Sequence, residues 1–160
     1  KIGLWGHSMA GNVILRTMAV KTDIPASVIW AGAVYSYKDR EEYGIQDTSY
    51  RPPQPQNVTQ SQSRRQRLFD TYGDFDQNNE FWSKFSAVNY LNEIKGALEV
   101  HHAVDDSVVN VGYSRDLMKL LGTTSIPHEL YEYPSGEHDI AGSSFNSAMQ
   151  RTVEFFRERL

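Results

Sequence analysis

The sequence contains no cysteine, and this absence excludes several kinds of chemistry at once. Disulfide bonds, a thiol nucleophile and a thiolate-bound metal all require cysteine. The chain also has no apolar run long enough to cross a membrane, and its formal net charge of -4 gives no basic footprint for nucleic acid. We therefore expect no membrane or nucleic-acid partner. The lack of cysteine leaves the compartment undecided, and we favour the cytoplasm.

The first eleven residues are the most informative segment of the chain. An apolar strand is followed by Gly-x-Ser-x-Ala-Gly and then by a stretch of helical composition, 11–21. This is a close variant of the Gly-x-Ser-x-Gly nucleophile elbow, in which a strained serine stands between a strand and a helix. Residues two positions before and after the serine must be small, and Gly6 and Ala10 meet this demand. We predict that Ser8 is a nucleophile.

An acid and a histidine follow Ser8 in the order that such a site requires. The predicted strand 97–103 runs into the acidic turn 105–106, and the predicted strand 128–133 runs into a loop with His138. Taken alone, each residue fits a structural role as a capping serine, a turn aspartate or a surface histidine. Together, each at a strand exit, they follow the chain order Ser, Asp, His of α/β-hydrolases.

Three segments carry a resemblance to a known family. Residues 6–11, 101–108 and 133–138 resemble the catalytic domain of prolyl-oligopeptidase-type and dienelactone-hydrolase-like serine hydrolases. The resemblance covers nearly the whole chain but only the second half of that domain. It implies an α/β fold, the C-terminal part of an α/β-hydrolase, with a mostly parallel sheet flanked by helices and a helical cap insertion. We therefore expect this chain to be part of a longer protein, and its partner to be the missing N-terminal half or a second copy.

The same resemblance assigns the acid. In the family a strand ends in His-Gly-x-x-Asp-x-x-Val, and this pattern places the triad acid at Asp105 with Val108 at the valine position. His102 then stands where the family has glycine. Asp106 is the rival acid, and two adjacent residues of a turn cannot both face His138. The family match favours Asp105.

The order of elements divides the chain into three parts. Residues 1–34 and 96–160 are expected to form the hydrolase core, and 35–95 a helical insertion resembling a cap, with a flexible Pro/Gln-rich loop at 51–63. The strands and helices expected beyond the elbow are strands 26–32, 97–103 and 128–133, and helices 37–43, 62–72, 77–92, 110–121 and one from about 144. In the last helix one face is expected to pack on the sheet through Phe145, Met149, Val153 and Phe156.

The insertion is rich in aromatic residues and has a short basic cluster. We expect most of the rings to be buried and a few to line an apolar pocket. These rings are Phe69, Tyr72, Phe75, Phe81, Trp82, Phe85 and Tyr90. The arginines Arg64, Arg65 and Arg67 fit a solvated helix face better than a grip on an acidic substrate.

These residues predict a serine hydrolase that works through an acyl-enzyme. His138 takes the proton of Ser8, Asp105 orients the imidazole, and the backbone N–H of Met9 binds the oxyanion. A carboxylesterase acting on a small acyl ester is our first choice. The alternatives are a peptidase acting on short peptides and a catalytically silent fragment of such an enzyme. No cofactor and no metal are expected.

Two further groups of histidines have other expected roles. His7 precedes the nucleophile, and its side chain is expected to point away from the site and to serve packing. A metal site formed by His101, His102, Asp105, Asp106 and His138 is disfavoured. Adjacent strand residues point to opposite faces, so His101 and His102 cannot both reach one ion.

Overall fold

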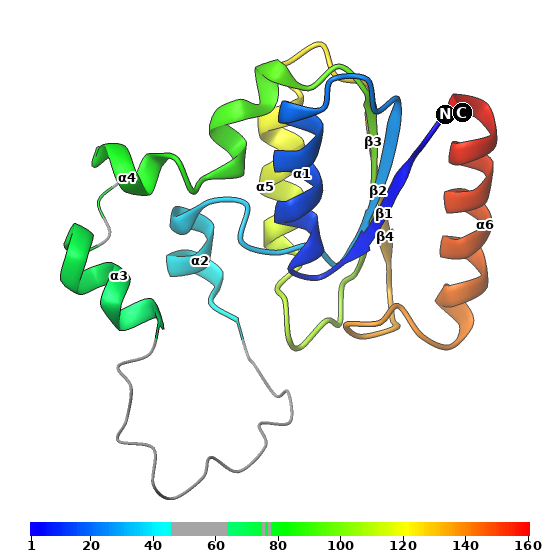
Figure 1. Cartoon of the computed structure of the whole chain (residues 1–160). Coiled ribbons are helices and arrows are strands. Elements are labelled where there is room, and N and C mark those ends of the chain that lie inside the picture. The colour runs from blue at the N-terminus through cyan, green and yellow to red at the C-terminus, as the bar shows by residue number, and fades with distance from the viewer. Residues whose placement is uncertain (46–63, 75, 77) are drawn as a thin grey trace, which may run out of the picture.

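A computed structural model describes residues 1–45, 64–74, 76 and 78–160. Its centre is a sheet of four parallel strands in the order β1-β2-β3-β4 (Figure 1). The strands are β1 Leu4–His7, β2 Ala26–Trp30, β3 Ala97–Ala103 and β4 His128–Tyr133. All four were expected at these places. The predicted mobile loop lies outside the described residues, and the three-part division of the chain stays a prediction.

Helices cover both faces of the sheet. α1 (Ala10–Val20) and α5 (Gly112–Leu121) lie on one face, and α6 (Ser143–Arg159) covers the other (Figure 1). The interval between β2 and β3 adds further short helices on the side of α1 and α5. These are α2 Tyr37–Tyr43, α3 Arg64–Tyr72, α4 Glu80–Ser83 and the 3-10 helix η1 Ala87–Glu93.

The predicted single helix 77–92 is wrong, because the chain breaks there into α4 and η1. Asn79 caps α4 by accepting from the backbone N–H of Phe81, and α4 ends after one turn. Ser86 then adopts an extended backbone (φ -76°, ψ 106°) before η1 begins. The rings of this region pack on one another: Tyr72 stacks on Phe81 with ring centroids 3.4 Å apart.

The two central strands are buried on both faces, as parallel strands between helix layers should be. Every residue of β2 and β3 is buried, including the polar ones of β3. One apolar core lies between the sheet and α1, α5 and η1, and a second lies between the sheet and α6. The buried strands β2 and β3 therefore anchor the loops that follow their carboxyl ends.

The face that α6 buries differs by about one residue from the predicted stripe. The buried residues are Ser144, Ala148, Thr152 and Phe155. Phe145 and Val153 are instead 42% and 38% exposed, whereas Met149 and Phe156 pack at the edge of the core. The small side chains at 148 and 152 let the helix approach the sheet, and Thr152 accepts a hydrogen bond from the Trp30 indole.

Candidate active site

Ser8 stands on a sharp turn between β1 and α1. Its backbone has φ of +57°, a strained conformation for a residue with a side chain. The turn is held by a hydrogen bond from Ser8 N–H to the Trp30 carbonyl (2.9 Å) and by one from Gly11 N–H to the Ser8 carbonyl (2.9 Å). This is the backbone geometry that the elbow pattern predicts.

The predicted need for small residues around Ser8 is confirmed by distances. A Cβ added to Gly6 would lie 2.8 Å from the Cβ of Ala10 and 2.8 Å from Ile14 Cδ1. Any side chain at position 6 would therefore push α1 away from β1. Ser8 is half-buried, and its Oγ makes no hydrogen bond with any group in the described ranges.

The start of α1 offers backbone donors next to Ser8. Met9 precedes the helix, its side chain is 75% exposed, and its N–H has no hydrogen-bond partner in the described part of the chain. Helix N-termini carry partial positive charge and attract developing negative charge. The Met9 N–H is thus available in the place where the sequence predicts an oxyanion donor.

A buried aspartate and His138 form a close pair at the same edge of the sheet. Asp106 Oδ2 lies 2.8 Å from His138 Nδ1, and the Asp106 side chain is fully buried. Asp106 Oδ1 accepts hydrogen bonds from the backbone N–H groups of Val108 and Val109, both at 2.8 Å. An acceptor-only carboxylate requires that His138 Nδ1 carries a proton, so the neutral ring has Nε2 free to take another.

Asp105, the predicted acid, does not lie against the His138 ring. Its carboxylate accepts hydrogen bonds from the backbone N–H groups of Gly136 (3.2 Å) and Glu137 (2.8 Å). The expected pairing of Asp105 with His138 is therefore corrected to Asp106. Asp105 instead holds the loop that carries His138, in which Glu137 has φ of +50°.

The family pattern fits the structure when it is read one residue later. His102 then takes the histidine position, Ala103 the glycine position, Asp106 the acid and Val109 the valine. Ala103 is small and fully buried, as a residue in place of glycine should be. With this register the residue at the glycine position is the small Ala103 in place of His102.

Opposing effects set the charge state of Asp106. Burial raises the pKa of this carboxyl, but hydrogen bonds from His102, His138 and the backbone N–H groups of Val109 and Val108 outweigh it. The pKa of Asp106 therefore lies well below its usual range. The group stays ionised at neutral pH, as a partner of an imidazolium must be.

His7 does not point away from the site, contrary to expectation. Its ring lies 4.5 Å from the His138 ring between centroids, and its Nε2 donates a hydrogen bond to the His138 carbonyl at 2.8 Å. Along β1, Gly6 faces α1, so its neighbour His7 faces the opposite side of the sheet. The His138 loop reaches that side. His7 therefore fixes the backbone of the proposed base.

The two adjacent histidines of β3 diverge as predicted. His101 bonds to Glu99 and Tyr133 toward α6, whereas His102 bonds to Ser114 of α5. The two rings are therefore separated by the sheet. Of the basic cluster, the Arg67 side chain is exposed, and the side chains of Arg64 and Arg65 lie outside the description.

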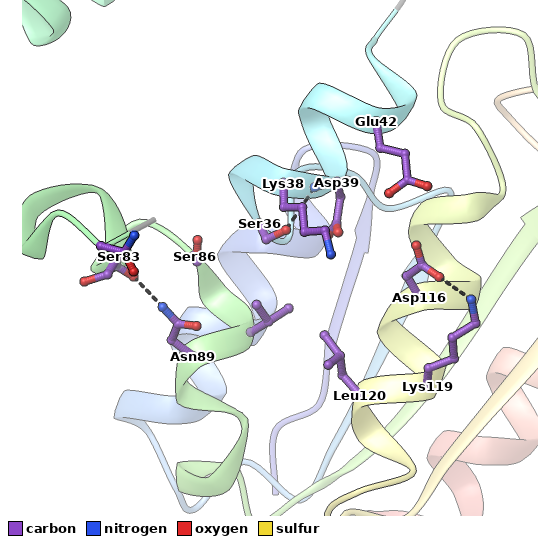
Figure 2. Close-up of a pocket in the computed structure, with 12 residues that line it drawn as sticks. Ser36, Lys38, Asp39, Glu42, Ser83, Ser86, Asn89, Asp116, Lys119 and Leu120 are labelled. Carbon is purple, nitrogen blue, oxygen red and sulfur yellow. Dashed lines mark hydrogen bonds and ion pairs between the residues drawn. The ribbon is translucent and has the colours of Figure 1, made fainter. Parts of the chain in front are cut away.

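A cavity of about 560 Å³ opens between α2, the α4–η1 segment and α5 (Figure 2). Charged residues of both signs line it, and none of Ser8, Asp106 and His138 does. Asp39, the buried acid on its wall, belongs to the cap of α2, where its N–H donates to Ser36 Oγ at 3.1 Å. Burial raises the pKa of Asp39. This cavity is therefore separate from the residues predicted for catalysis.

No model of a known protein family matches the chain, and no curated protein matches it. Within the described ranges, no helix is both long and apolar enough to span a membrane.

Solved structures show the fold. An acylaminoacyl peptidase from Pyrococcus horikoshii superposes over 100% of this chain and 24% of its own, with a TM-score of 0.69 and 20% identity. A dipeptidyl peptidase 4 from Porphyromonas gingivalis superposes over 99% of this chain and 20% of its own, with a TM-score of 0.69 and 18% identity. The esterase PF2001 from Pyrococcus furiosus superposes over 99% of this chain and 54% of its own, with a TM-score of 0.60 and 18% identity. The chain thus has the fold of part of an α/β-hydrolase, and it spans between a fifth and about half of these proteins.

Proposed function

We propose that this chain carries the nucleophile, base and acid of a serine hydrolase that cleaves acyl bonds. The observation that carries the proposal is the buried Asp106–His138 pair, which follows β3 and β4 in a sheet where Ser8 ends β1 in a left-handed turn. In parallel sheets of this kind the carboxyl ends of the strands gather the reacting groups. Asp106 takes the role that the sequence assigned to Asp105.

Each group has one task in the reaction. His138 Nε2 accepts the proton of Ser8 Oγ while the oxygen attacks the acyl carbon, and Asp106 stabilises the resulting imidazolium. The Met9 N–H binds the oxyanion, a contribution of about 3 kcal/mol per donor. His138 then passes the proton to the leaving group, and water cleaves the acyl-enzyme by the same steps.

The substrate is proposed to be a small carboxylic ester. The half-buried Ser8 beside the exposed Met9 suits a compact, accessible acyl group. Short peptides are the alternative, which is favoured by the likeness to an acylaminoacyl peptidase and a dipeptidyl peptidase. A comparison of p-nitrophenyl acetate with an aminoacyl p-nitroanilide separates the two classes. The cytoplasmic location stays a prediction.

A further strand is proposed to cover β1. Among the described residues β1 pairs only with β2. Large apolar residues before, within and after β1 are exposed, since Ile2, Trp5, Met9, Val13 and Val20 are 51 to 83% exposed. Such an edge favours pairing with another segment. We propose that a preceding segment of a longer chain occupies it. Alone, the chain should self-associate, and a monomer in ultracentrifugation that unfolds cooperatively would contradict this.

The reaction is tested by intact mass after incubation with a fluorophosphonate. Ser8 Oγ should form a bond to phosphorus, with loss of fluoride and transfer of the serine proton to His138. We expect a single adduct on the chain and none on Ser8→Ala. A folded chain without adduct, or an adduct that persists in Ser8→Ala, would refute the proposal.

The corrected acid is tested by two matched variants. Asp106→Asn should lower the labelling rate by about 10⁴-fold, because an amide facing His138 favours the wrong tautomer. Asp105→Asn keeps one side-chain oxygen for the loop and should cost less than about tenfold, the value of one hydrogen bond. The opposite ranking would return the acid role to Asp105.

A further inference from the structure

His102 is a buried histidine whose ring is held at both nitrogens. The side chain is fully buried, its Nδ1 lies 2.7 Å from Ser114 Oγ, and its Nε2 lies 2.9 Å from the Val109 carbonyl. Because a carbonyl only accepts, His102 Nε2 carries a proton. In the neutral ring Nδ1 then accepts the hydroxyl proton of Ser114. The protein thus fixes both the orientation and the tautomer of this ring.

The same nitrogen also lies beside the proposed catalytic acid. His102 Nε2 lies 3.2 Å from Asp106 Oδ2, the oxygen that accepts from His138 Nδ1 at 2.8 Å. Asp106 Oδ2 therefore lies between two imidazole nitrogens. Val109 closes the arrangement, since its N–H donates to Asp106 Oδ1 and its carbonyl accepts from His102.

A buried carboxylate needs donors on both oxygens, because an unsatisfied buried charge is costly. The two backbone N–H groups satisfy Oδ1 of Asp106, and His138 alone would be left to satisfy Oδ2. A second nitrogen beside Oδ2, held in place by Val109 and Ser114, helps to keep the carboxylate in position.

We propose that His102 is a positioning residue, which holds Asp106 ionised and aimed at His138 without touching substrate. The inference rests on the proposed function, because it gives Asp106 its catalytic task. The hydrogen bond from His102 is also among the causes that keep the pKa of Asp106 low, after the opposing effect of burial. Ser114 supports the ring from α5.

Three substitutions of His102 separate a donor role from packing. His102→Phe keeps the ring volume and removes the donor. His102→Gln places its amide nitrogen near the position of Nε2, whereas His102→Asn places it near Nδ1. His128→Gln is the matched control, since His128 lies at the start of β4 and bonds only to the Ile126 carbonyl in the described part of the chain.

The first measurement is the labelling rate with the fluorophosphonate. Loss of precise alignment costs up to about 100-fold in such sites, so we expect His102→Phe and His102→Asn to lose about 10- to 100-fold. His102→Gln should recover most of the rate, and His128→Gln should match the parent. Equal rates for Phe, Asn and Gln at position 102 would show a packing role and overturn the inference.

The second measurement does not depend on activity. The pKa of Asp106 is followed by carbon NMR of the ¹³C-labelled carboxyl, assigned with Asp106→Asn. His102→Phe should raise this pKa, and His102→Gln should restore it. An unchanged pKa in His102→Phe overturns the inference even if the parent is active. If the parent is not labelled but the pKa shifts as expected, the proposed function fails while the hold of His102 on Asp106 stands.

Discussion

Glu99 and His101 form a buried polar pair between β3 and α6, and its removal gives a sharp test of the core. Glu99 is 3% exposed and His101 is fully buried. Glu99 Oε1 lies 2.7 Å from His101 Nε2, and His101 Nδ1 lies 2.8 Å from the Tyr133 hydroxyl. Thr152 Oγ1 lies 3.4 Å from the same Nε2 and is its next neighbour.

Loss of the histidine alone should be costly. His101→Phe fills a similar volume between Trp30 and Tyr133, whose rings lie 5.6 and 5.9 Å from the histidine ring. It leaves the Glu99 carboxylate buried without a donor, and breaking a buried pair in this way costs about 3 to 5 kcal/mol. This is a large part of the stability of an ordinary domain, about 5 to 15 kcal/mol.

Replacement of both partners should be milder than loss of one. In Glu99→Leu/His101→Phe no unpaired carboxylate is left between β3 and α6, and such replacements are often neutral or stabilising. Urea unfolding followed by circular dichroism gives the free energies, with Glu99→Gln as the isosteric control. If His101→Phe unfolds at the same urea concentration as the parent, or if the double variant is no better than His101→Phe, the reasoning is refuted.

Three further outcomes follow from contacts described above. Folding lowers the pKa of Asp106, so the ionised carboxylate stabilises the folded chain above about pH 4, and this stabilisation is lost as the pH falls. When the pH is lowered from 6 to 3, the unfolding free energy should therefore decrease more for the parent than for Asp106→Asn. Gly6→Ala should lower the unfolding free energy by about 1 to 3 kcal/mol through overpacking, whereas at Gly122→Ala the added Cβ meets only ordinary contacts and the loss should be small. Urea midpoints of the two variants test this, and equal midpoints would contradict it. Arg115→Ala removes an exposed pair with Glu132 and should change the unfolding free energy by less than about 1 kcal/mol; a larger loss in the same assay would disprove that view.

Local sequence patterns predicted the sheet well because each strand is marked by its own residues. β2 is an apolar run interrupted only by Ser27, and the elbow requires small residues around its serine, so the sequence predicts both within a residue or two. The aspartate that pairs with His138 is harder to predict. The pattern His-Gly-x-x-Asp-x-x-Val fits from His101 to Val108 and equally from His102 to Val109. The choice depends on which aspartate the backbone of Val108 and Val109 surrounds, and this contact appears only in the folded turn.

The other differences also arise from long-range packing. The contact of His7 with the carbonyl of His138 joins residues 131 positions apart, and no pattern near β1 contains it. The face of α6 was misplaced because apolar spacing pointed to Phe145 and Val153. The sheet instead needs the small residues Ala148 and Thr152, which allow close approach. The spacing of apolar residues predicts that a helix packs on the sheet, but the shape of the sheet surface decides which face of the helix is buried.

The acidic turn after β3 has a consequence for motion. Asp106 holds the ring of His138, while Asp105, the preceding residue, holds the backbone that leads to that ring. Both tethers start from one short stretch of chain. When β3 and β4 shift relative to each other in thermal fluctuation, the ring and its loop must therefore travel together. The Asp106–His138 pair is therefore insulated from such movement, and the hydrogen bond from His7 to the His138 carbonyl ties the same loop to the end of β1.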